Sequence, residues 1–348
     1  MFLIDKYTPK VLDDAFFHGE LLNMLKTMST DESIPHMIFY GPPGSGKKTI
    51  INLFLEMIYD KDVHQLEDCV YKVVGSGNKI TEVVVKQSNY HIIIEPNNNN
   101  FDRYLIQDIV KEYAKRIPLD VFKTKKVFKT VLINCVDNLS YYAQTSLRRT
   151  MEKYSGTCRF IMWCRSLSRV IDPLKSRCLC FRVASPTYAE LFEWVLTVCA
   201  YENIKLSLKD NIKIVEEAKG NIKFALWNIE LLRSGLFGKN MYLQTVKQIS
   251  DLICEVKIDN LQTIRTLLYN VMITNVSSTE IIKDVMFKIC ESPLIQNESK
   301  YKIIEITAKY EHNLTRGRRD IVHLIGFVAT TMKIIFDERN KVKVLENN

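Results

Sequence analysis

The sequence has 348 residues, of which 47% are hydrophobic and 25% are charged, a composition typical of a globular protein with two or three domains. Its formal net charge is +8, and no apolar run approaches the roughly 18 to 20 residues that cross a bilayer, so we expect neither secretion nor membrane insertion. The nine cysteines are scattered and include no CxxC pair, which predicts a reduced, metal-free intracellular protein.

The first half of the chain alternates short β-rich runs with helical patterns. Residues 37–40 form an apolar run that breaks at a glycine-rich segment, and a helical period follows from Ile50 to Ile58. This alternation predicts an α/β fold in which helices cover a mostly parallel sheet. Further strands are expected at 91–95, 127–134 and 159–164, with helices near 103–116 and 141–154.

The β-rich runs end near Ser185, and helical patterns continue from there to the C-terminus. We therefore expect an α/β domain over residues 1–184, a small helical domain over 185–242 and a separate all-helical domain over 243–348.

A glycine-rich loop stands between the first predicted strand and its helix. Such glycines let backbone N–H groups turn toward phosphates, and Lys47 is placed to reach the β- and γ-phosphates. The motif requires Ser or Thr directly after the lysine to hold Mg²⁺, whereas this chain has Lys48, and Thr49 lies about 100° further round the helix. The loop consists of Gly41, Pro42, Pro43, Gly44, Ser45, Gly46 and Lys47.

The strand predicted at 127–134 is where acidic residues should follow to hold Mg²⁺ and activate water. Asn134 and Cys135 stand there instead. An amide supplies no anionic charge to a divalent cation, and a thiol does not polarise water as a carboxylate does. We expect nucleotide binding without hydrolysis, and residual hydrolysis in cis is the alternative.

Positive charge gathers in one stretch of the chain. Between Arg148 and Arg182 there are nine basic residues against two acidic ones, Glu152 and Asp172. A solvated face and a surface for phosphates both fit this distribution.

Several segments resemble AAA+ clamp loaders, specifically the small subunits of replication factor C. Asp5–Lys10 is similar to the family's DKYRP segment, with Thr8 in place of Arg. Leu147–Ser155 resembles the helix after the family's Walker B strand, and Ile171–Cys178 carries its Ser-Arg-Cys motif. Gly220–Lys223 matches the sensor-2 turn, with Lys in place of Arg.

The resemblance covers essentially the whole chain. Tyr310–His312 and Phe327–Ala329 look like collar helices of the end-of-arc subunit, whose own ATPase site is degenerate. The sensor-1 position, normally Asn, is Arg165. The resemblance implies an AAA+ P-loop domain, a helical lid and a collar for the three predicted domains.

The resemblance also implies roles for individual residues. Tyr7 and Pro9 would lie near the base, and Lys223, Lys48 and Thr49 would join the loop in binding ADP or ATP, with Mg²⁺ doubtful. Arg177 would be an arginine finger that acts in a neighbouring subunit's site.

The implied partners are the other subunits of a hetero-pentamer, a sliding clamp of the PCNA type and primer-template DNA bound without sequence specificity, at a nuclear or other replication site such as a viral one. Arg103, Arg148 and Arg149 are candidate phosphate contacts, although Arg148 and Arg149 could instead bridge subunits. Two alternatives remain open: an active DNA-dependent ATPase, and a shared subunit of a checkpoint or cohesion clamp loader.

Overall fold

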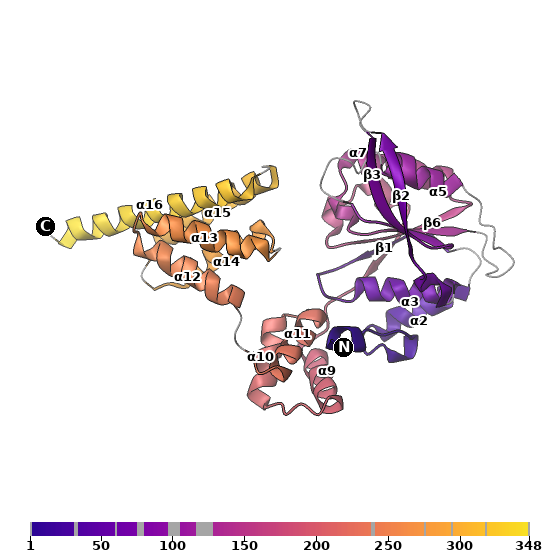
Figure 1. Cartoon of the computed structure of the whole chain (residues 1–348), viewed down its shortest axis with the longest axis horizontal. Coiled ribbons are helices and arrows are strands. Elements are labelled where there is room, and N and C mark those ends of the chain that lie inside the picture. Colours follow the sequence, from indigo (N-terminus) through magenta and orange to yellow (C-terminus); the bar gives the residue numbers. More distant parts are fainter. Residues whose placement is uncertain are drawn as a thin grey trace. The chain divides into compact units, whose positions relative to one another are not determined.

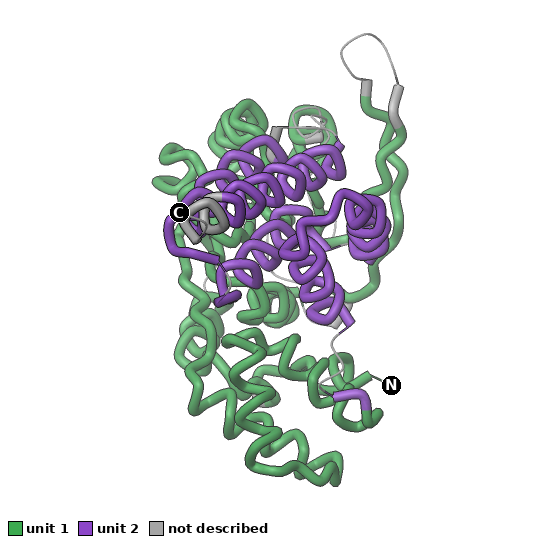
Figure 2. The backbone as a smooth tube through the Cα atoms, turned by 90° about the vertical axis from the view of Figure 1, so that its left-hand side faces the viewer, with its two compact units in different colours: residues 1–235 green, residues 236–348 purple. Residues whose placement is uncertain are grey.

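The computed structural model describes residues in two compact units, Met1–Gly235 and Leu236–Asn348 (Figure 2). The described residues are 2–30, 34–59, 61–74, 80–96, 105–115, 128–237, 241–274, 276–293, 295–316 and 319–346.

Within its described residues, the first unit contains one seven-stranded sheet in the order β2-β3-β4-β5-β6-β1-β7 (Figure 1). Strands β4, β5, β6, β1 and β7 are parallel, and the β2-β3 hairpin joins this block antiparallel through β3. The residues that follow β1, β5 and β6 therefore lie at one edge, where α/β proteins bind ligands. The strands are β1 (Met37–Tyr40), β2 (Glu67–Val74), β3 (Ile80–Gln87), β4 (His91–Ile94), β5 (Lys129–Ile133), β6 (Cys158–Cys164) and β7 (Leu179–Arg182).

Both faces of the parallel strands are covered by helices, because successive side chains point to opposite faces and both sets are apolar. Ile38 packs in one core cluster with Leu147 of helix α7, whereas Phe39 packs in the other with Phe54 of helix α3. Figure 1 shows α2 and α3 on one side of the sheet and α5 and α7 on the other. The helices of this layer are α1 (Leu3–Lys6), α2 (Gly19–Thr30), α3 (Lys47–Tyr59), α5 (Lys111–Lys115), α7 (Tyr141–Lys153) and α8 (Asp172–Lys175), and a π-helical turn over Leu105–Val110 leads into α5.

Three helices follow the sheet within the same unit, and side-chain caps define where each begins. Thr187 and Glu190 form a reciprocal capping box at the start of the first helix, and Ser207 and Asn221 cap the next two. We call these three helices the lid: α9 (Tyr188–Tyr201), α10 (Leu208–Ala218) and α11 (Ile222–Arg233).

All the regular elements in the described residues of the second unit are helices. Its core gathers Ile, Leu and Val side chains with Phe327. The helices are α12 (Met241–Glu255), α13 (Asn260–Ile273), α14 (Ser278–Glu291), α15 (Asn297–Arg316) and α16 (Asp320–Glu346). Among the residues described, none of the helices has the length and apolar character required to cross a bilayer.

The predicted fold class is confirmed: a mostly parallel sheet with covering helices is followed by helices alone. The sequence analysis did not include the β2-β3 hairpin or β7. The domain boundaries after residues 184 and 242 stay predictions.

Candidate functional site

The glycine-rich loop joins β1 to the start of α3, as predicted. Gly44 has φ +75°, and a Cβ atom there would lie 1.9 Å from Oδ1 of Asn221, so the position demands glycine. The backbone N–H of Ile222 donates to the Gly44 carbonyl over 3.1 Å. The loop is thus in direct contact with the first residues of α11, where the predicted sensor-2 turn lies.

Lys47 is buried inside the loop, with 5% of its surface exposed. Its ammonium donates to the carbonyls of Gly41, over 2.8 Å, and Pro42, over 2.6 Å. Burial, the largest influence, lowers the pKa of this ammonium. The ammonium therefore lies within the loop, held by two of the loop's own carbonyls.

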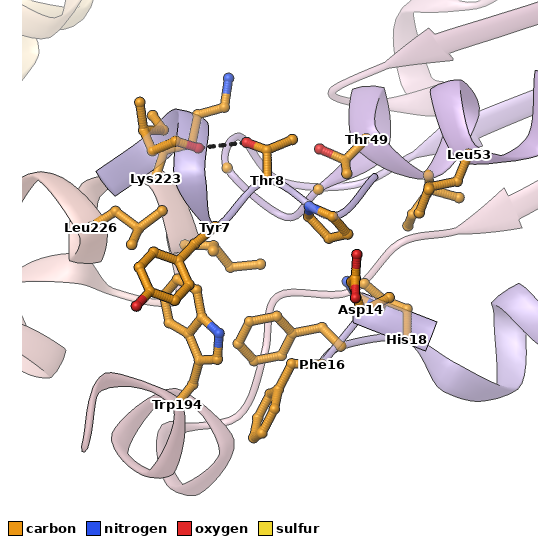
Figure 3. A pocket seen from close by; sticks show the side chains of 18 of the residues that line it. Tyr7, Thr8, Asp14, Phe16, His18, Thr49, Leu53, Trp194, Lys223 and Leu226 are labelled. Carbon is orange, nitrogen blue, oxygen red and sulfur yellow. Dashed lines mark hydrogen bonds between the residues drawn. The ribbon is translucent and has the colours of Figure 1, made fainter. Parts of the chain in front are cut away.

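A pocket lies beside the loop, between the N-terminal segment, α3 and the lid (Figure 3). Its wall is mainly apolar and aromatic, as a site for a flat purine base requires. Six sequence-predicted site residues line it, namely Tyr7, Pro9, Gly44, Gly46, Thr49 and Lys223, whereas Lys48 is exposed on α3.

Trp194 and His18 are among the pocket residues that the sequence analysis did not include. Trp194 of α9 forms part of the wall, and its ring lies 5.3 Å from that of Phe17, centroid to centroid. Nε2 of His18 lies 2.9 Å from the Ser45 carbonyl, which makes Nε2–H the donor because a carbonyl only accepts. Neither residue stands in a local motif, so only the fold brings them to the loop.

Asn134 follows β5 at the position where an acid was expected, and both its amide nitrogen and its amide oxygen make a hydrogen bond. The amide nitrogen donates to Oε1 of Glu95 over 2.8 Å, and its oxygen accepts from Nε1 of Trp163, also over 2.8 Å. The residue is 5% exposed. Its oxygen thus already accepts one hydrogen bond from the indole, and as a neutral amide it offers no anionic charge to a cation.

Cys135 follows Asn134 in the left-handed conformation, with φ +48°. Burial, and to a lesser degree Asp137, raises the pKa of its thiol. Asp137 accepts from the Arg165 backbone N–H over 3.1 Å, and its other oxygen is buried without a hydrogen-bond partner in the described part of the chain. Asp137 is the acid that the sequence analysis did not include in the site.

These residues do not match the usual set of magnesium ligands. The position after Lys47 carries an ammonium, the Asn134 oxygen is engaged, and a thiol is a poor ligand for a hard cation. In the regions that could be described, no group of three or more His, Cys, Asp or Glu residues is arranged to hold a metal.

Arg177 lies exposed on the turn after α8. Its Nη2 is 2.6 Å from Oε1 of Glu152 on α7, and its Nη1 donates to the Pro173 carbonyl over 2.8 Å. The guanidinium is therefore oriented by two contacts at the protein surface.

Two of the three candidate DNA contacts lie among the described residues. Arg149 is exposed on α7, and Arg148 is half-buried, with its Nε lacking a partner in the described structure. Arg103 lies outside the described residues.

Two family models match this chain. Residues 242–339 match the model described as replication factor C subunit 3, C-terminal domain. Residues 17–187 match the model for the delta subunit of DNA polymerase III.

Full-length relatives give the same family. A protein of Acanthamoeba polyphaga mimivirus named as a replication factor C small subunit is 40% identical, with 98% of this chain and 93% of that protein covered. Replication factor C subunit 3 of Arabidopsis thaliana is 34% identical, covering 96% of this chain and 97% of the relative. Replication factor C subunit 5 of Saccharomyces cerevisiae is 33% identical, covering 94% and 98%.

Proposed function

This chain belongs to the replication factor C small-subunit family of AAA+ clamp loaders, and we propose that it acts as a non-hydrolysing subunit of such a loader. Membership of the family places the chain among nucleotide-binding proteins of DNA replication that work with other subunits. The proposal that the chain does not hydrolyse ATP is supported by the hydrogen bonds that the side-chain amide of Asn134 makes to Glu95 and Trp163.

We propose that the loop and the adjoining pocket bind ADP or ATP. The loop's N–H groups and Lys47 would hold the phosphates, and the pocket wall around Tyr7 and Pro9 would hold the base. A ligand that binds only the folded state adds about 2.7 kcal/mol of stability at one hundred times its dissociation constant. A thermal melt with and without ADP tests this. Lys47→Ala should lose the ADP-dependent rise in melting temperature, and no rise in the original chain would refute nucleotide binding.

The proposed loss of hydrolysis is supported at two separate positions. Lys48 replaces the hydroxyl that would hold Mg²⁺, and Asn134 with Cys135 replaces the acids that would hold the metal and polarise water. We expect the purified chain to bind ADP without turning over ATP. ATP turnover by the purified chain alone that Lys47→Arg abolishes would contradict the degenerate-site proposal, whereas turnover that survives this substitution would come from a contaminating ATPase.

We propose that Arg177 serves the active site of a neighbouring subunit. Its support is the Ser-Arg-Cys motif, its exposed position and the planar fork of donors that suits a developing charge on a γ-phosphate. In the assembled complex, Arg177→Ala should lower ATP turnover and clamp loading. Arg182→Ala is the matched control, because it removes the same charge from an exposed position on β7. Unchanged ATP turnover in the complex carrying Arg177→Ala would refute this role of Arg177 in the neighbouring site.

The remaining partners follow from the same proposal. The assembly would be a hetero-pentamer that loads a PCNA-type ring onto primer-template DNA in the nucleus or at a viral replication site. Arg148 and Arg149 would contact phosphates, so binding should weaken as salt rises and should not depend on base sequence.

A further inference from the structure

The N-terminal segment, residues 2–9, is fastened to the lid. The ring of Phe2 lies 5.7 Å from that of Trp227 on α11, centroid to centroid. The Leu3 backbone N–H donates to Oε2 of Glu230, also on α11, over 2.9 Å, and the Leu3 side chain is buried. An N-terminal segment is ordinarily poorly ordered unless contacts such as these tie it down.

Glu202, which caps the C-terminal end of α9, is the polar centre of this attachment. One oxygen of its carboxylate accepts from Nζ of Lys6 over 2.5 Å and from the Tyr7 hydroxyl over 2.8 Å. Its other oxygen is 4.0 Å from Nη1 of Arg233 on α11. Its side chain is 11% exposed, so these contacts are partly shielded from water.

Tyr7 belongs both to this attachment and to the wall of the pocket. Its ring lines the pocket beside Trp194, while its hydroxyl points away to Glu202 (Figure 3). Thr8 and Pro9 continue the same wall. Because the segment also makes one wall of the pocket, its attachment to the lid fixes where that wall stands. Glu202 itself does not line the pocket.

We propose that Glu202 is a positioning residue for the nucleotide, which holds Tyr7 and the N-terminal segment against the base and so ties base affinity to the lid. This inference rests on the proposed binding of ADP or ATP. It assigns a role to a residue that does not itself line the pocket and stands in no nucleotide-binding motif.

Direct binding of ADP to the full chain tests the assignment. Glu202→Ala should weaken ADP binding by up to about tenfold, because the released segment must then be ordered on binding at a cost no larger than the hydrogen bond that held it in place. Glu202→Gln retains an acceptor oxygen and should lie between Glu202→Ala and the original chain. Glu193→Ala is the matched control, since it removes a carboxylate from an exposed position on the same helix and should bind ADP unchanged.

Two further measurements separate positioning from general stabilisation. Tyr7→Phe removes only the hydroxyl, and combining it with Glu202→Ala should weaken binding no more than Glu202→Ala alone, because both changes break one contact. Burial and the Glu202 hydrogen bond together raise the pKa of Tyr7 to about 12. In ¹³C-tyrosine NMR without nucleotide, the Tyr7 signal should therefore titrate at lower pH in Glu202→Ala.

The outcomes are distinct. If the original chain binds ADP and Glu202→Ala binds it equally well, the positioning role is overturned while nucleotide binding stands. Additive losses in the double variant, or a Tyr7 titration that does not move, would likewise overturn it. If the original chain binds no ADP, both the proposed nucleotide binding and the positioning role of Glu202 are refuted.

Discussion

The hydrogen bonds of the Asn134 amide predict what happens when the missing acid is restored by Asn134→Asp. Asn134→Asp replaces the amide nitrogen that donates to Glu95 with a second carboxylate oxygen. The donor is lost, and two negative groups then stand about 2.8 Å apart, as the two side chains do in the original chain. The single substitution should therefore destabilise the first unit instead of repairing its site.

The magnitude follows from the geometry. A hydrogen bond to a charged acceptor contributes about 1.5 to 3 kcal/mol, and the lower end applies because Glu95 is exposed. Repulsion across this distance adds about 1.5 kcal/mol at the dielectric constant of water. We expect the free energy of unfolding to fall by about 3 kcal/mol at pH 8. The deficit should shrink toward pH 5, because the introduced carboxyl has a raised pKa, takes up a proton and donates again.

A second substitution should remove the deficit. Glu95→Gln, just after β4, supplies a donor to the carboxylate introduced at position 134, just after β5, and the other carboxylate oxygen still accepts from Trp163. Urea denaturation followed by tryptophan fluorescence measures this, since Trp163, Trp194 and Trp227 all lie in the first unit. If Asn134→Asp is as stable as the original chain, or the double variant is no more stable than the single one, the reasoning is refuted.

Two other predictions concern the phosphate loop and two histidines, of which His91 is buried and His36 is half-buried. Gly44→Ala should abolish ADP-dependent stabilisation, because its Cβ would meet Asn221 at 1.9 Å. A Cβ at Gly46 meets nothing within 4 Å, so Gly46→Ala should lose only about 1 to 3 kcal/mol through backbone strain. Equal losses of both variants in thermal melts would contradict this. Burial lowers the pKa of both His36 and His91 to about 4, so the unfolded chain takes up protons first, and stability should hold above about pH 6.5 and fall by about 3 kcal/mol per histidine toward pH 4. Urea denaturation at several pH values in this window should show that the free energy of unfolding falls less steeply with falling pH in His91→Gln. An unchanged pH dependence would exclude this histidine as a cause.

The sequence predicted the features that depend on neighbouring residues. The phosphate loop is such a feature, because its glycines, its lysine and the strand and helix around it are contiguous. The β2-β3 hairpin escaped prediction although its facing residues, such as Tyr71 and Val83, are paired and partly buried. Its charged residues obscured the alternation of apolar and polar positions.

The residues that surround Asn134 depend on the fold instead. Ile94 pairs with Ile133 in the parallel register of β4 and β5, so the next residues, Glu95 and Asn134, meet at the carboxyl edge. Trp163 comes from β6, on the other side of β5. A motif search along the chain reads Asn134 as the loss of an acid, whereas the packed sheet shows the hydrogen bonds that occupy the amide in its place.

The contact between Gly44 and the cap of α11 has a mechanical consequence. The chain enters the lid from β7, past Val183, whose carbonyl would lie 2.0 Å from a Cβ at Gly41, and α11 returns to the loop at Asn221. Both crossings touch the phosphate loop, so a rotation of the lid against the sheet would pivot there. Points near the pivot travel little and points far from it sweep widely, so the distant ends of the lid helices would turn a small adjustment at the phosphates into a large displacement.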